Sequence, residues 1–197
     1  AVLFLYFIIV QFVNHWRGKV ESTTDALIAF GAGTVGALTF AFTDSHWFNA
    51  VEAEVYAFST FFTAIVVWLA LLWSEKADEK GNERYILIIS YMIGLATGLH
   101  LLNLLTIPFV ALLIYFRKFK FKWTSFGILV ALTGLVFFII HNVIIKGMPK
   151  IADAIGVSLT GLLIVTIFAS MVWAILNHKQ LISIVLTSMV LILIGYS

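Results

Sequence analysis

The sequence contains no cysteine, only 2 prolines and few charged residues for a chain of 197 residues. Without cysteine the chain can form neither disulfides nor thiolate metal sites, so the redox state of its compartment stays undetermined. Charged residues make up 11% of the chain, whereas soluble domains carry about 25%. The chain therefore has too few polar side chains to cover a surface exposed to water.

The chain is rich in apolar residues instead. The chain is 62% hydrophobic and its mean hydropathy is +1.07. Long apolar runs alternate with short polar breaks, which predicts an all-α, polytopic membrane helical bundle. The net charge of +2 says little about partners, and no basic block suggests a nucleic-acid partner.

We expect about eight membrane segments, because about 20 apolar residues, within a range of about 17 to 25, cross a bilayer. The run 85–116 is too long for one straight span and has polar residues at its centre, His100 and Asn103. It is either one tilted helix kinked at Pro108 or a hairpin that turns near His100. The segments, counting two arms in that run, are 1–14, 26–42, 55–73, 85–116, 124–145, 155–176 and 180–196.

The basic residues favour the hairpin. With a hairpin, all but two of the 12 Lys and Arg residues fall in polar breaks on one side, and the exceptions are Lys146 and Lys150. Cytoplasmic loops carry an excess of Lys and Arg, so that side is expected to be cytoplasmic. The opposite side then holds the breaks Thr43–Ser59, His100–Asn103 and Val143–Asp153.

The stretch Thr43–Ser59 has the highest density of reactive side chains, including two carboxylates, Glu52 and Glu54. A carboxylate this close to hydrocarbon is costly and is a functional-site hypothesis by default. Asn49 and Glu52 have the spacing of a capping box, in which Asn49 caps a helix and Glu52 bonds back to the Asn49 N–H. For Glu52 we give this structural role the same weight as a functional one. Glu54 points about 200° away from Glu52 on a helix, so it needs a partner, a proton or a ligand.

The remaining polar residues of these breaks have a structural and a functional reading. Trp47 and Tyr56 are typical of interfacial aromatic residues, or they stack on a sugar or a lipid head group, and His46 reads as an exposed loop residue. His100 and Asn103 share a helix face, where they form interhelical hydrogen bonds or line a cavity in which His100 contacts a phosphate. No three ligands have the spacing of a metal site, and a divalent metal stays undetermined.

Two other patterns have structural explanations. Gly31 to Gly36 matches the letters of a dinucleotide-binding motif, but it opens no βαβ unit, so we interpret it as close helix packing. The basic stretch Phe116–Lys122 is typical of a topology anchor, with contact to anionic lipid as a second reading.

Two blocks, Phe42–Ser59 and Tyr91–Pro108, resemble a family of Bacteroidetes polytopic membrane proteins that was long of unknown function. That family is similar to a vertebrate transmembrane O-mannosyltransferase of plexin-type domains, in the GT-C glycosyltransferase superfamily. The resemblance covers about residues 36 to 116, and Gly195-Tyr196-Ser197 fits it weakly.

The resemblance implies a GT-C-like fold and a membrane glycosyltransferase. Such an enzyme takes a sugar, here expected to be mannose, from a polyprenyl-phosphate carrier and places it on Ser or Thr of an exported protein. The implied location is the bacterial inner membrane, with membrane lipids as further partners and the site facing the periplasm.

The resemblance also bears on the catalytic residues. The family's acidic Asp-Cys-Gly-Glu motif and its His-Pro-Pro-Gly stretch are expected to precede Ala1. Residues 1–197 are therefore expected to be a single transmembrane domain from inside a longer protein, without its first outer loop and C-terminal part. Glu54 is then a candidate for a supporting catalytic role. The candidate substrate-binding residues are Glu52, His46, Trp47, Asn49, Tyr56, His100 and Asn103.

Whether the chain is an enzyme stays open at this point. One alternative is a transporter or flippase core, in which Glu54, His100 and Asn103 form a proton or substrate path. We find no internal repeat of the kind that transporters often contain. The other alternative is a non-catalytic membrane subunit of a larger complex.

Overall fold

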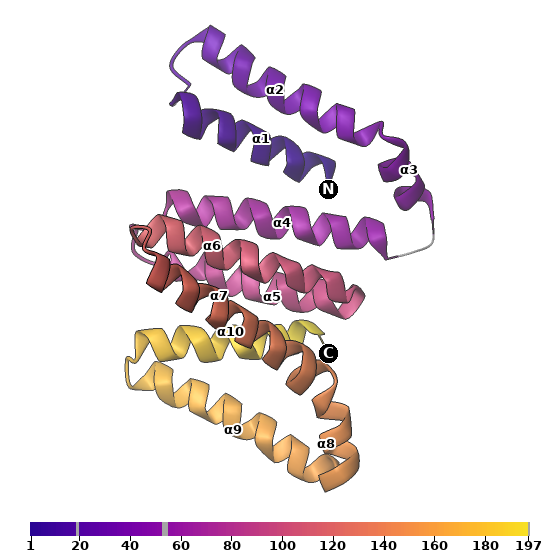
Figure 1. The fold of residues 1–197 in the computed structure, drawn as a ribbon, viewed down its shortest axis with the longest axis vertical. Helices are drawn as coiled ribbons and strands as arrows, with labels where there is room; N and C mark the ends of the chain where they lie inside the picture. The colour runs from indigo at the N-terminus through magenta and orange to yellow at the C-terminus, as the bar shows by residue number, and fades with distance from the viewer. Residues whose placement is uncertain (19, 53–54, 197) are drawn as a thin grey trace.

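The computed structural model describes residues 1–18, 20–52 and 55–196, and every regular element in these ranges is helical. This confirms the predicted all-α class. The long helices lie side by side with their axes close to parallel (Figure 1). The elements are α1 (Val2–Arg17), α2 (Thr23–Ala41), α3 (Asp44–Val51), α4 (Tyr56–Glu75), α5 (Glu83–Leu99), η1 (Leu101–Leu105), α6 (Thr106–Lys118), α7 (Trp123–Phe138), η2 (Ile139–Ile145), α8 (Gly147–Ile155), α9 (Val157–Leu176) and α10 (Gln180–Tyr196).

Within the described ranges, 5 helices are long and apolar enough to cross a membrane. Two further apolar helices, α1 and α10, are shorter, with 16 and 17 residues. The chain is thus a helical membrane protein, but the predicted count of about eight membrane segments is not confirmed. The long apolar helices are Thr23–Ala41, Tyr56–Glu75, Leu101–Lys118, Trp123–Asn142 and Val157–Leu176.

The bundle has two chemically different ends. At one end lie the connections from α1 to α2, α4 to α5, α6 to α7 and α9 to α10, and we call it the basic end (Figure 1, left). At the other lie α3, η1 and α8, and we call it the α3 end. The described parts of the three breaks predicted to share one side, 43–59, 100–103 and 143–153, therefore do lie at one end.

The chain reverses direction at His100, whose extended backbone lies between α5 and η1. Arg117 Nε at the end of α6 donates to the Ser74 carbonyl at 2.8 Å, and Lys118 Nζ donates to the Ala77 carbonyl at 2.8 Å. Both acceptors lie near the end of α4, so α6 returns to the basic end, as the predicted hairpin requires. Pro108 falls in the first turn of α6, where its missing N–H has no intrahelical partner to lose.

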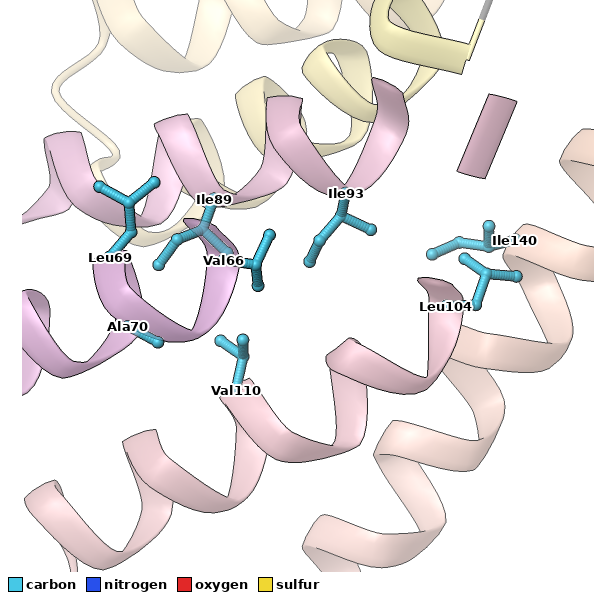
Figure 2. Packing of buried hydrophobic residues seen from close by; sticks show 8 residues of the cluster. All are labelled: Val66, Leu69, Ala70, Ile89, Ile93, Leu104, Val110 and Ile140. Carbon is cyan, nitrogen blue, oxygen red and sulfur yellow. The ribbon is translucent and has the colours of Figure 1, made fainter. Parts of the chain in front are cut away.

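The core lies between α4, α5 and α6 and extends to η1 and η2. Figure 2 shows its side chains directed into the space that these helices share. Val66 of α4 and Leu104 of η1 are fully buried in it. Close packing of this kind holds membrane helices together, because lipid is as apolar as their side chains. The cluster consists of Val66, Leu69, Ala70, Ile89, Ile93, Leu104, Val110 and Ile140.

Small residues bring α1 and α2 together. A Cβ added at Gly33 would lie 2.7 Å from Val10 Cγ2, and one added at Gly36 would lie 2.5 Å from Ile9 Cδ1. The predicted close packing is therefore confirmed at Gly33 and Gly36. A Cβ at Gly31 would meet nothing within 4 Å.

Glycines also allow direct backbone contact between α5 and α10. A Cβ on Gly94 would lie 2.5 Å from the Ile192 carbonyl oxygen, and a Cβ on Gly195 would lie 2.7 Å from Leu95 N. Backbone atoms cannot move aside as a flexible side-chain end can. Any larger residue at Gly94 must therefore separate the two helices.

We expect Gly94→Leu to lower the free energy of unfolding by about 1–3 kcal/mol, because overpacking forces the backbones apart. Unfolding in mixed micelles, followed by tryptophan fluorescence, measures the change. Gly161→Leu on α9 is the matched control, because a Cβ there meets nothing within 4 Å. Equal losses in the two variants would contradict close packing of α5 on α10.

Candidate functional site

Asn103 joins three elements at the α3 end. Its side chain is only 2% exposed. Its Oδ1 accepts hydrogen bonds from Ser59 Oγ at 2.9 Å and from Thr63 Oγ1 at 3.1 Å, both on α4. These hydroxyls lie one helical turn apart, so they share the face of α4 that η1 covers. Asn103 thereby fixes η1 against α4.

The amide nitrogen of Asn103 bonds the backbone at the end of α5. Asn103 Nδ2 donates to the Ala96 carbonyl at 2.7 Å and to the His100 carbonyl at 3.0 Å. Thr106 Oγ1 donates to the Asn103 carbonyl at 2.7 Å. The Ala96 carbonyl also accepts from the His100 N–H, the His100 carbonyl from the Asn103 N–H and the Asn103 carbonyl from the Thr106 N–H. Asn103 and Thr106 thus add second hydrogen bonds to these carbonyls and hold the turn after α5 in place.

His100 is oriented by its own backbone neighbourhood. Its Nδ1 accepts from the Leu102 N–H at 3.2 Å, so the neutral imidazole carries its proton on Nε2. Its ring centre lies 5.4 Å from that of Tyr56, which is 42% exposed. In the part of the chain that the structure describes, His100 Nε2 has no hydrogen-bond partner. It is available as a donor to a phosphate or a sugar.

The helix α3 begins at a cap that differs from the predicted one. Thr43 Oγ1 accepts from the His46 N–H at 3.4 Å and donates to the Phe40 carbonyl at 2.8 Å. The predicted capping box is wrong, because Asn49 lies inside α3 and Glu52 follows its last residue. Thr43 precedes the same helix and takes the cap position, with an acid, Asp44, in the first turn.

The predicted substrate residues of α3 lie at the same end but apart from η1. The His46 ring centre is 4.4 Å from that of Phe40 on α2, Trp47 is 61% exposed, and Glu52 is exposed. Asn49 is half-buried. Among the described residues no hydrogen bond or ring contact joins α3 to η1.

The structure therefore divides the predicted set. It brings Tyr56, His100 and Asn103 together, and it adds Ser59 and Thr63, which the sequence reasoning had not assigned to the site. Their hydroxyls, four residues apart on an apolar helix, were the available signal. Glu54, the candidate catalytic residue, lies outside the described residues. Within the ranges described, no group of three His, Asp or Glu side chains could hold a metal ion.

A family model described as the protein O-mannosyl-transferase TMEM260 N-terminal domain matches residues 1–123. The chain belongs to this family. The match includes both blocks that carry the predicted resemblance, 42–59 and 91–108, and it confirms that resemblance. Comparisons with curated proteins and with solved structures gave no match.

Family membership gives the site a chemical context. The family is that of a protein O-mannosyltransferase-like glycosyltransferase, and the 5 apolar helices make the chain a membrane protein. Tyr56, Ser59, Thr63, His100 and Asn103 all lie within the matched residues.

We expect Asn103→Asp to lower the free energy of unfolding by about 1–3 kcal/mol. The substitution keeps the shape but places a carboxylate oxygen or hydroxyl where Nδ2 now donates to two carbonyls. Thermal unfolding in detergent measures the loss. Asn142→Asp is the control, because Asn142 is exposed and its Nδ2 donates only to the Phe138 carbonyl. If Asn103→Asp is as stable as this control, the hydrogen bonds of Asn103 do not stabilise the fold.

Proposed function

We propose that the protein transfers mannose from a polyprenyl-phosphate carrier to Ser or Thr of an exported protein. The family match over residues 1–123 carries the proposal. The polar junction at the α3 end supports it, because it offers hydrogen-bond donors beside an apolar cavity. The donor, the acceptor and the sugar are the parts to be tested.

We place the site on the non-cytoplasmic side of the membrane. Loops that are rich in Lys and Arg stay in the cytoplasm, and such loops gather at the basic end. The junction of Tyr56, His100 and Asn103 lies at the opposite end. In a bacterial inner membrane that end faces the periplasm.

His100 is proposed to bind the carrier phosphate. As the glycosidic bond breaks, negative charge accumulates on the leaving phosphate, and a fixed donor aimed at it lowers the barrier. His100 Nε2–H is such a donor, since the Leu102 N–H holds Nδ1. Tyr56 supports the ring from one side, and Asn103 fixes the backbone of η1.

Carboxylates are proposed to act on the acceptor. Transfer to a hydroxyl requires a group that takes the acceptor proton. We assign Glu54 a supporting role, in which it orients the acceptor hydroxyl or assists the base. Glu52, exposed after α3, and the α3 residues His46, Trp47 and Asn49 are proposed to contact the sugar or the acceptor.

An apolar cavity beside the junction fits the lipid part of the carrier. It has a volume of about 400 Å³ between α6 and α7, and it begins at Leu105, two residues after Asn103. Its wall includes Gly134, where an added Cβ would meet nothing within 4 Å. The remaining lining is Pro108, Leu112, Phe126, Leu129, Val130, Thr133 and Phe137. Isoprenoid units match such a surface.

We expect His100→Phe to lower kcat/KM for the polyprenyl-phosphate mannose donor by about 10- to 100-fold, the value of a hydrogen bond to a charged group. The substitution keeps a ring against Tyr56 and removes the Nε2–H. Transfer to a Ser/Thr acceptor by the purified full-length protein is the assay.

The assay has a positive and a negative comparison. Glu54→Gln should also lower transfer, by about tenfold or more. His141→Phe is the control, because His141 packs on Phe137 at the same end and has no proposed role. The His100 assignment is wrong if His100→Phe and His141→Phe transfer equally, and no transfer by the unaltered protein would refute the proposed function.

We expect Gly134→Leu to raise KM about tenfold for a long polyprenyl-phosphate donor, because the new side chain displaces buried isoprenoid surface. The KM for a donor with a truncated, water-soluble chain should be unchanged. Gly127→Leu on the same helix is the control, since it has equal space and does not line the cavity. If KM rises equally for both donors, the carrier lipid does not bind in this cavity.

A further inference from the structure

Two adjoining cavities lie between α1, α4 and α6 near the basic end, whereas the polar residues proposed for transfer lie at the α3 end. The larger has a volume of about 590 Å³ and the smaller about 120 Å³. They share four lining residues, which makes them one continuous recess. The shared residues are Phe12, His15, Leu71 and Ser74.

The larger cavity has an apolar wall and a cationic edge. Phe109, Leu112 and Leu113 of α6 form the wall, and Arg117 forms the edge. Because α6 is one of the apolar membrane helices, the wall lies at hydrocarbon depth and the arginine at the interface. This order, from apolar to charged, is that of a phospholipid from its acyl chains to its head group.

Gln11 provides an independent sign of a missing partner. Both polar atoms of its side chain, Nε2 and Oε1, are buried and have no hydrogen-bond partner among the described residues. Such groups are rare in native proteins, because each costs free energy when unpaired. Gln11 lines the smaller cavity, six residues before Arg17 and thus about 9 Å below the end of α1. The glycerol ester carbonyls of a lipid lie at such a depth and accept hydrogen bonds.

Arg117 keeps part of its guanidinium for a ligand. Its Nε donates to the Ser74 carbonyl at 2.8 Å, and its Nη2 pairs with Asp78. This pairing lowers the pKa of Asp78, whose side chain is 72% exposed. Arg117 Nη1 is left to face a phosphate, and His15 lines the same cavity.

A carboxylate completes the recess. Glu75 lines the smaller cavity next to Ser74, and in the ranges described it has no ion-pair or hydrogen-bond partner. Arg117 lines the larger cavity, Glu75 lines the smaller one and Ser74 lines both, so the recess offers one positive and one negative group. That arrangement is complementary to a head group in which a phosphate is joined to a primary ammonium.

We propose that this recess binds phosphatidylethanolamine. The phosphate contacts Arg117 and His15, the ammonium donates to Glu75, and an ester carbonyl accepts from Gln11 Nε2. An anionic lipid fits less well, because Glu75 would repel it. A choline head group has no N–H to donate to Glu75.

Native mass spectrometry of the full-length protein tests the proposal with phosphatidylethanolamine, phosphatidylcholine and phosphatidylglycerol of identical acyl chains. We expect the protein to retain phosphatidylethanolamine at least about threefold better than either other lipid, the value of one partly exposed ion pair. Glu75→Gln should abolish the preference over phosphatidylcholine. Gln11→Leu should lower retention of both phosphatidylethanolamine and phosphatidylcholine.

Glu79→Gln is the matched control, because Glu79 is exposed at the same end and lines neither cavity. It should keep the preference. Equal retention of the three lipids would mean ordinary annular lipid and would overturn the proposal. A preference for phosphatidylglycerol, or an unchanged preference in Glu75→Gln, would overturn it as well.

Discussion

The requirement that every backbone polar group be paired inside hydrocarbon governs this structure. The chain meets it easily along straight helices, and the difficulty arises at the break between α5 and α6. There α5 ends at Leu99 and η1 occupies 101–105 before α6 begins. One amide, that of Asn103, accepts from two hydroxyls of α4 and donates to the Ala96 and His100 carbonyls on either side of the end of α5. Because both faces of this amide are used, α4, α5 and η1 share one polar contact, and the apolar core packs around it.

The reversal at His100 also separates the chemistry of the two ends. It returns α6 to the basic end, where Arg117 and Lys118 bind carbonyls at the end of α4. It leaves His100 at the α3 end, with Nδ1 held and Nε2–H free to donate. A hydrogen-bond donor without net charge, His100 Nε2–H, thus lies at the α3 end, and the cations Arg117 and Lys118 lie at the basic end. A phosphate-bearing lipid can be accommodated at either end, by neutral donors in the first case and by Arg117 in the second.

The sequence predicted the features that depend on composition and charge. Helical class follows from apolar runs, and the hairpin follows from the asymmetry of Lys and Arg, since a single kinked span would have placed Arg117 on the wrong side. Features that depend on competition between neighbours were missed. The Asn49–Glu52 spacing suits a capping box, but Thr43 precedes the same helix and takes the cap. Ser59 escaped notice because a hydroxyl on an apolar helix commonly bonds its own backbone, as Thr60 does to Tyr56. The number of spans depends on helix lengths near the lower limit for crossing, which composition does not determine.

Under the proposed function, the two parts of the candidate site, η1 with His100 and the separate helix α3, differ in how firmly they are held. The η1 side is fixed by four side-chain hydrogen bonds of Asn103, so His100 holds its position whether or not a carrier is bound. The α3 side is held by the Thr43 cap and the packing of His46 on Phe40, and these contacts tie it to α2 rather than to η1. A preorganised donor costs no reorganisation during the reaction, which is what stabilisation of a leaving phosphate needs. An acceptor protein, by contrast, presents varied surfaces around its hydroxyl. A short helix such as α3, with no link to η1 among the described residues, can adjust to these surfaces without disturbing His100.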